Sequence, residues 1–146
     1  MIYLLDLSPY DPVGAATVTL RYCSGHLAVT DGGNTYRPRV DQAFSFSQSV
    51  FAGEFGRALP QVGQIVLKNA DGKLDHLTGY RWDDRLITVK RGPVGGPFTT
   101  YAVVRGAAVA WTDQAITIPL ADLGAKFYRP LQATTYAGSG GAEGPA

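Results

Sequence analysis

Apolar and polar residues alternate along much of the chain, and this alternation predicts β-strands. The segment 16–23 is the clearest case, because Val18, Leu20 and Tyr22 are separated by polar neighbours, so that one face of a strand would be apolar. Similar or short apolar runs predict strands at 2–7, 16–23, 26–30, 35–40, 42–50, 64–69, 85–92, 100–111 and 115–120. Pro38 favours an edge or a strand end for its segment.

Turn residues separate these strands. The stretches 31–33 and 112–114 each predict a tight hairpin, and Gly106 predicts a bulge or bend within its long strand. With 18 Gly and 9 Pro, few windows sustain a helical period; 121–131 is the exception, with room for one or two helical turns capped by Asp122. We therefore expect an all-β fold with minor α content, an antiparallel sandwich or barrel with at most one short helix.

The length of 146 residues fits one domain, which we place at 1–136. The segment 137–146 is rich in glycine and reads as a flexible linker. A domain that stops in such a linker is typical of one part of a longer polypeptide. Because the chain starts at Met1, we expect the missing part to be C-terminal.

Charge and composition narrow the function classes. Charged residues make up 17% of the chain, against about 25% in an average soluble protein, and the net charge is +1 without a long basic run. Sequence-specific nucleic-acid binding and membrane-surface binding are therefore not expected. No apolar run is long enough for a membrane span, and Asp6 interrupts the N-terminal apolar run, so we expect synthesis in the cytoplasm without export. Cys23 is the single cysteine, which excludes an intrachain disulfide.

The segment 67–92 concentrates acidic and amide side chains between two predicted strands. Asn69, Asp71, Gly72 and Asp75 form a turn motif, because Asn and Asp side chains bond nearby backbone N–H groups and Gly tolerates positive φ. The alternative is a bound cation. An EF-hand loop requires Glu at its twelfth position, and counting from either Asn69 or Asp71 that position is aromatic. We interpret the motif as structural, without a metal or a cofactor.

The sequence also lacks the residue patterns of acid/base, zinc, phosphate-binding and nucleophilic sites. Asp83 and Asp84 are adjacent, so on a strand they point to opposite faces, and Glu54 is only a remote partner for either. His26 and His76 are the only histidines, too few for a zinc site without further ligands. Neither a phosphate-binding loop nor a nucleophile elbow is present. The sequence therefore predicts no catalytic residues and no enzyme activity.

Aromatic side chains leave a binding role open. Tyr80 and Trp82 lie beside Asp83 and Asp84, and these four residues are a candidate interaction surface. A sugar-binding module would expose such an aromatic next to carboxylates, with Trp82 the first candidate. The alternative is core and sheet packing, in which aromatic residues are enriched.

The central segment "GQIVLKNADGKLDHLTGYRWDDRLITVKRG" resembles a pattern in tail proteins of long-tailed bacteriophages, prophages and gene transfer agents. The positions that carry the resemblance are Asn69, Asp71, Gly72, Leu74, Asp75, Tyr80, Asp84, Arg85, Ile87, Val89 and Gly92. The closing segment 129–146 is similar to the junction at which such proteins continue into a further domain.

This resemblance implies the N-terminal domain of a distal-tail or baseplate-hub-like protein, with a β domain of the tail-tube or hub type. It implies self-association into a ring, a trimer or a hexamer, around the DNA channel of a virion tail, with neighbouring tail proteins as partners. Such a role is architectural and needs no cofactor. The alternative is a carbohydrate- or receptor-binding β module at a tail tip.

Overall fold

The computed structural model describes residues 1–41, 46–50 and 58–121, with the backbone alone described for 46–50 and 58–62. The helical turn predicted at 121–131 with its cap Asp122, the linker 137–146 and Glu54 lie outside the described residues.

The described chain is almost entirely β-structure, which confirms the predicted fold class. The strands are β1 (Ile2–Leu7), β2 (Tyr10–Asp11), β3 (Ala16–Thr17), β4 (Leu20–Cys23), β5 (Val29–Asp31), β6 (Asn34–Pro38), β7 (Phe46–Val50), β8 (Ala58–Val62), β9 (Gln64–Lys68), β10 (Leu86–Gly92), β11 (Thr99–Gly106), β12 (Ala110–Trp111) and β13 (Ala115–Ala121), and a short 3₁₀ helix, η1, covers Asp75–Gly79. Two predicted strands are each divided, 16–23 into β3 and β4 and 100–111 into β11 and β12. The strands β2 and β8 and the helix η1 were not predicted. None of the helical structure in the described part of the chain has the length and apolar character to cross a membrane.

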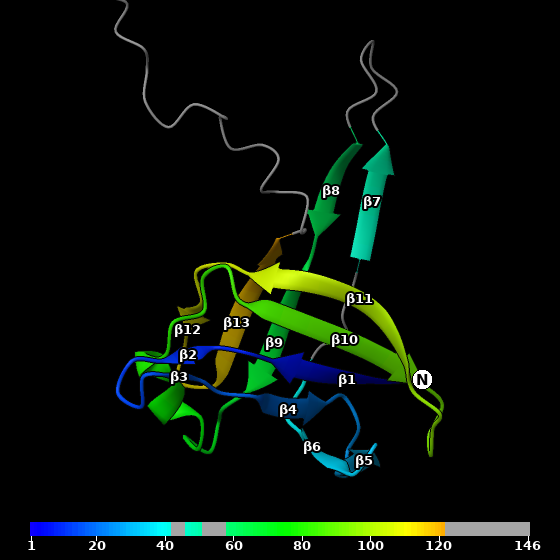
Figure 1. Ribbon diagram of the computed structural model, residues 1–146, viewed down its shortest axis with the longest axis horizontal. Coiled ribbons are helices and arrows are strands. Elements are labelled where there is room, and N and C mark those ends of the chain that lie inside the picture. The colour runs from blue at the N-terminus through cyan, green and yellow to red at the C-terminus, as the bar shows by residue number, and fades with distance from the viewer. Residues whose placement is uncertain (42–45, 51–57, 122–146) are drawn as a thin grey trace, which may run out of the picture.

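Nine strands form one strongly curled sheet (Figure 1). Its order is β12-β13-β11-β10-β1-β4-β6-β5, and β9 pairs with the other edge of β13. All of these pairs are antiparallel except β4 with β6. Both predicted hairpins are confirmed, since β5 turns into β6 and β12 into β13. In the first, Gly32 and Gly33 have φ of +55° and +78°, as a tight hairpin turn requires.

The segment 39–41 joins the two ends of this curl. The Asp41 N–H donates to the Val66 carbonyl of β9 at 2.8 Å, and the Val40 N–H donates to the Cys23 carbonyl of β4 at 3.1 Å. One short segment therefore hydrogen-bonds to β9 on one side and to β4 on the other. The sheet becomes barrel-like, and the interior is closed.

The main core fills this interior. It consists of alternate residues of the strands together with residues from the loop that contains η1: Leu5, Leu7, Tyr22, Val40, Ile65, Leu67, Leu74, Leu77, Trp82, Ile87, Val89, Val104, Ile116, Ile118 and Leu120. In β13 the apolar residues at every second position are buried, as an inward-facing barrel strand requires.

A smaller core lies on the opposite face of β1. Leu4, Cys23 and Tyr36 are fully buried there, beneath the β5–β6 hairpin. Leu4 and Leu5 are adjacent and point to different faces, so β1 is apolar on both sides. This explains why the segment 2–7 reads as a short apolar run and not as an alternation.

Gly106 was predicted as a bulge or bend. The long predicted strand does break after this residue, but the bulge lies elsewhere. The register between β10 and β11 shifts between Val89 and Lys90, where Tyr101 is the extra residue of β11. Gly106 instead ends β11, where a Cβ would lie 3.0 Å from the carbonyl oxygen of Trp82. The glycine permits a close approach of two backbones, and the prediction of a bulge at this residue is wrong.

Removing a side chain from the closed interior should cost far more stability than removing the same side chain from the surface. Leu5 is 1% exposed, and Leu5→Ala should lower the free energy of unfolding by about 2–5 kcal/mol, because a cavity remains. Leu27 is 80% exposed, and Leu27→Ala should change it by no more than about 0.5 kcal/mol. Urea unfolding measures both, and equal losses would contradict the assignment of the core.

Candidate functional site

The acidic loop, residues 69–75 between β9 and η1, is organised by the side chain of Asn69. This residue is 2% exposed. Its Oδ1 accepts the Leu74 N–H at 2.8 Å, and its Nδ2 donates to Asp75 Oδ1 at 2.7 Å. The Gly72 N–H donates to the Asn69 carbonyl at 2.9 Å, and Gly72 has φ of +64°. Asn69, Gly72 and Asp75 are therefore brought together around one buried amide.

Asp71 points the other way, toward the segment that closes the barrel. Both of its oxygens accept hydrogen bonds from the Arg39 guanidinium, at 2.7 and 2.8 Å. This bidentate contact holds the pKa of Asp71 well below its ordinary value and raises the pKa of Arg39. Lys73 adds a longer ion pair of 3.6 Å. The contact fastens the acidic loop to the strand-like segment 39–41.

The carboxylates of the loop thus have different partners. Asp71 is bound to Arg39, and Asp75 to Asn69. Within residues 1–41, 46–50 and 58–121, no three His, Cys, Asp or Glu side chains come together in a group suited to a metal ion.

Trp82 does not lie on the surface. It is 5% exposed, and its Nε1 donates to the Leu77 carbonyl at 3.3 Å. Together with Leu74 and Leu77 it packs against the main core. The expectation of a solvent-facing Trp82 is wrong, because the residues after the acidic loop form a compact 3₁₀ turn whose apolar side chains point inward.

The other three members of the candidate surface lie around this buried ring without forming one patch with it. Tyr80 is half-buried and stands edge-on to His76, with ring centres 6.2 Å apart. Asp83 and Asp84 are exposed. Asp84 has φ of +59°, and its Oδ1 lies 3.1 Å from Arg105 Nη1.

A cleft that the sequence did not indicate opens between the acidic loop and the β12–β13 turn, and we call it the Trp111 cleft. Its volume is about 420 Å³, and its lining residues are Asn69, Ala70, Gly72, Asp75, Thr78, Trp111, Thr112 and Asp113. The Asn69 N–H donates to the Gln114 carbonyl at 2.7 Å, which holds the two turns side by side. Each turn is recognisable in the sequence, but their contact depends on the pairing of β9 with β13.

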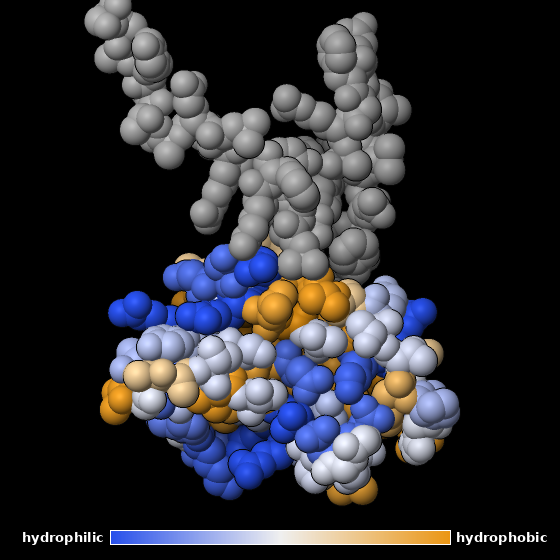
Figure 2. Space-filling model, in the orientation of Figure 1, coloured by the Kyte–Doolittle hydropathy of each residue, from blue (hydrophilic) through white to orange (hydrophobic). Residues whose placement is uncertain are grey.

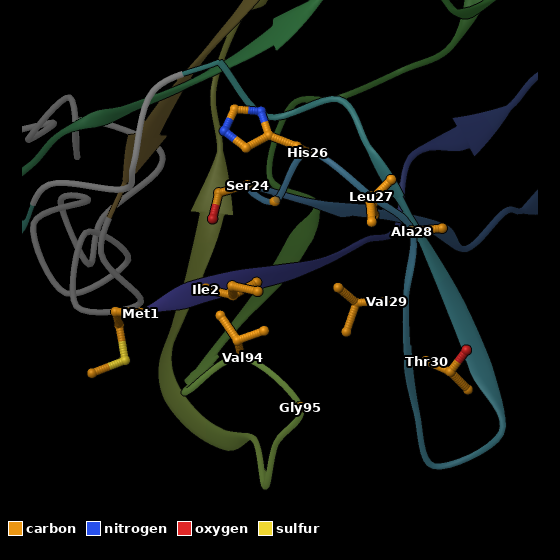
Figure 3. A pocket seen from close by; sticks show the side chains of 11 residues that line it. Met1, Ile2, Ser24, His26, Leu27, Ala28, Val29, Thr30, Val94 and Gly95 are labelled. Atoms are coloured by element: carbon orange, nitrogen blue, oxygen red, sulfur yellow. The ribbon is translucent and has the colours of Figure 1, made fainter.

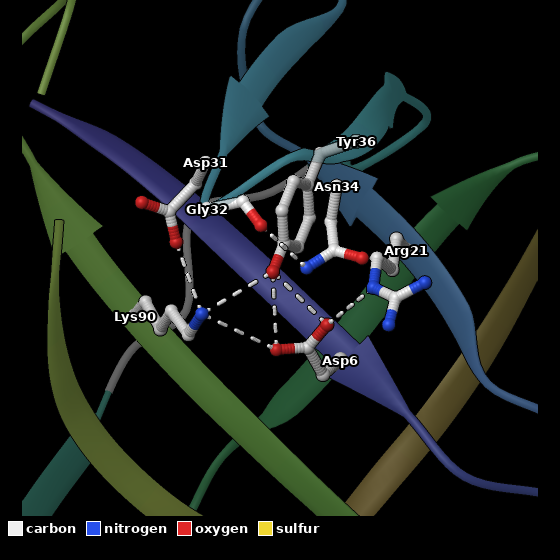
Figure 4. A network of polar contacts seen from close by, with 7 residues as sticks. All are labelled: Asp6, Arg21, Asp31, Gly32, Asn34, Tyr36 and Lys90. Carbon is white, nitrogen blue, oxygen red and sulfur yellow. Dashed lines mark hydrogen bonds and ion pairs between the residues drawn. The ribbon is translucent and has the colours of Figure 1, made fainter.

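A polar network crosses the outer face of β1 beneath the β5–β6 hairpin (Figure 4). Lys90 Nζ lies 3.0 Å from Asp31 and 3.8 Å from Asp6, and Arg21 Nε lies 3.3 Å from Asp6. The buried Tyr36 hydroxyl donates to Asp6 at 3.0 Å. The hydrogen bond to Asp31 raises the pKa of Lys90, and burial raises the pKa of Tyr36. The network ties the hairpin to the sheet.

An apolar groove lies at the end of β1 beside β5 (Figure 3). The side chains of Ile2, Val29 and Val94 converge there from β1, β5 and the loop after β10, around a volume of about 610 Å³. Leu27 and Val94 at its rim are 80% and 82% exposed. In the view of Figure 2, hydrophobic residues reach the surface in several separate areas between polar ones.

Two features of the backbone face outward. The strands β7 and β8 pair only with each other among the described strands, from Phe46 with Val62 to Val50 with Ala58, and this hairpin projects away from the barrel (Figure 1). Over Thr99–Val104, β11 pairs with β10 on one side, while β13 joins its other side only at the following two residues. At Val103 and Val104, this edge pairs with no further described strand.

Comparison with known proteins finds a chain of similar fold but no matching sequence family. No family model matches the chain, and no curated protein matches it. A solved structure, "Virion of native gene transfer agent (GTA) particle", contains a chain of similar fold, with a TM-score of 0.58 and 15% sequence identity. The match covers 92% of this chain and 44% of the other, so this chain spans less than half the length of its structural neighbour.

Loss of the Asn69 amide should destabilise the fold. Asn69→Ala leaves the buried Leu74 N–H without its acceptor, so the free energy of unfolding should fall by about 1–3 kcal/mol. Asn34→Ala removes an amide whose longer bond, 3.4 Å to the Gly32 carbonyl, is exposed, and should cost no more than about 0.5 kcal/mol. Denaturant unfolding compares the two, and a loss at Asn34 as large as that at Asn69 would refute a special role for the buried amide.

Stability should fall at alkaline pH. The pKa values of Tyr36 and Lys90 are raised from 10.0 and 10.5, so the unfolded chain releases these protons first and is favoured as pH rises above about 10. Tyr36→Phe removes one of these groups and should flatten the decline in melting temperature above about pH 10. An unchanged slope in Tyr36→Phe would count against the linkage.

Proposed function

We propose that this chain is a structural component of a phage-like tail and that it forms part of the distal-tail or baseplate-hub ring around the DNA channel. The likeness of its fold to a chain of a gene transfer agent virion supports this proposal. On this proposal the role is architectural, not enzymatic, and the protein resides in the virion tail.

The projecting β7–β8 hairpin is the observation that carries the proposal. An isolated two-stranded hairpin is marginally stable in water at best, because it has no layer on which to pack. Here each strand pairs only with the other among the described strands, and the ribbon extends beyond the barrel. A neighbouring subunit would supply the missing layer.

The outer edge of β11 offers a complementary surface. Unpaired strand edges present N–H and C=O groups to which another chain can add. This edge carries β-branched residues, including Val103, which is 39% exposed. A contact between the hairpin of one copy and the edge of the next joins two different surfaces. Such a contact generates a ring when the rotation closes.

Both a trimeric hub and a hexameric tube-like ring can be built from this contact, and electron microscopy would give the number of subunits. In either ring the neighbours along the tail axis would be other tail proteins. The carboxylates of the acidic loop, bound to Arg39 and Asn69, keep their structural role within each copy.

Replacing residues 42–62 by a short Gly/Ser linker should abolish ring formation while the barrel stays folded. The chain, co-expressed with its neighbouring tail proteins, should form rings of one order in negative-stain electron micrographs. The linker variant should give monomers that still unfold in one cooperative thermal transition, because β7 and β8 pair only with each other among the described strands. Rings of the same order without the hairpin would overturn this contact.

A charge on the β11 edge should weaken the same assembly. Val103→Lys introduces a solvated cation at the proposed interface, the device by which natural edges avoid pairing. Val13→Lys, at a residue that is 94% exposed and away from this edge, is the control. We expect ring loss in the first variant and intact rings in the second, counted on micrographs; rings in both would exclude this edge from the interface.

A further inference from the structure

We propose that the Trp111 cleft binds a neutral sugar residue, with the indole as the stacking surface and Asp75 and Asp113 as acceptors for sugar hydroxyls. This inference is independent of ring assembly. It places carbohydrate binding at a tryptophan other than Trp82, whose ring is inside the core.

The indole of Trp111 is both held and accessible. It belongs to β12, pairs with Ile116 across the hairpin, and packs against the main core. Part of the residue remains outside, since it is half-buried and lines the cleft. Its ring nitrogen donates no hydrogen bond to any side chain or backbone group of the described residues. An aromatic side chain with a buried body and an accessible polar edge suits contact with the apolar C–H face and the hydroxyl rim of a sugar.

The opposite side of the cleft presents a fixed carboxylate. Asp75 Oδ1 is held by the Asn69 amide at 2.7 Å, and Asn69 is itself buried. Thr78 donates to the Asp75 carbonyl at 2.8 Å, so its oxygen keeps accepting capacity toward the cleft. Hydrogen bonds from hydroxyls to a carboxylate are stronger than those between neutral groups, and a carboxylate held in place loses little freedom on binding.

Asp113 completes the polar lining from the β12–β13 turn. Its side chain is exposed and has no hydrogen bond or ion pair to another residue of the described chain. Acceptors thus line the cleft from both turns, together with Trp111. The volume of about 420 Å³ lies within the roughly 300–1,000 Å³ typical of small-molecule sites.

The charge of the lining selects the class of ligand. Two carboxylates and no Lys, Arg or His line the cleft, which disfavours phosphate, sulfate and acidic sugars. A divalent cation is the competing ligand. Calcium takes six to eight oxygen ligands, whereas the lining of this cleft contains only two carboxylates, Asp75 and Asp113, on separate turns. A neutral polyhydroxylated ring uses the indole as well as the carboxylates, and a cation does not.

The test is isothermal titration of the full chain with neutral oligosaccharides of glucose, galactose and N-acetylglucosamine, chosen after a glycan array. At least one should bind, and Trp111→Ala and Asp75→Asn should each weaken it by about tenfold or more. Trp111→Phe keeps an aromatic surface and should weaken binding less than Trp111→Ala. Tyr101→Ala, which removes an aromatic outside the cleft, should leave affinity unchanged.

Thermal melts establish that each variant is folded. If Trp111→Ala does not fold, Asp113→Asn at the exposed turn is tested in its place. Binding of none of the neutral glycans, or binding that persists in folded Trp111 and Asp113 variants, would overturn the proposal. Calcium binding without glycan binding would do the same. If Trp111→Ala loses glycan binding but still forms rings, then glycan binding and ring assembly are independent, and one proposal can fail without the other.

Discussion

The fold depends on the hydrogen bonds by which segment 39–41 links β9 to β4. Without them the curled sheet would have two open edges and an interior exposed along one seam. Val40 bonds to the Cys23 carbonyl, Asp41 to the Val66 carbonyl, and the side chain of Val40 enters the main core. Backbone closure and apolar burial therefore occur at the same residues. The Arg39–Asp71 pair anchors the acidic loop to segment 39–41, the segment that closes the barrel.

Closure of the barrel explains why the interior is apolar and paired while some strands on the outside keep an open edge. The strands of the barrel are paired with one another, and the described features that stay open include the outer edge of β11 at Val103 and Val104 and the β7–β8 ribbon. The smaller core and its polar network fix the β5–β6 hairpin against β1, where Tyr36 is fully buried while its hydroxyl bonds to Asp6. The same strand, β1, thereby supports an apolar interior and a polar exterior.

Strand positions were predictable because period-two alternation and turn residues are local signals. The all-β class, the strand at 64–69 and the hairpins at 31–33 and 112–114 follow from them. The parallel pairing of β4 with β6 and the role of 39–41 were not predictable, because both depend on contacts between strands and not on the composition of either. Trp82 was misplaced for a related reason. Its inward direction is set by the 3₁₀ turn at Asp75–Gly79, where Leu77 and Trp82 lie on one side, and the sequence shows there only a polar loop with an aromatic.

The two tryptophans show how local structure separates a packing residue from a surface residue of identical chemistry. Trp82 follows a turn whose apolar residues all face the core, and its nitrogen is used by the Leu77 carbonyl. Trp111 sits at the end of a two-residue strand, where the hairpin leaves part of the residue accessible beside Asp113. The Asn69 amide links the two environments, since it directs Leu74 toward the core and Asp75 toward the cleft. The buried Asn69 side chain thus stabilises the loop that contributes Leu74 to the main core, and it also fixes the position of the Asp75 carboxylate at the surface.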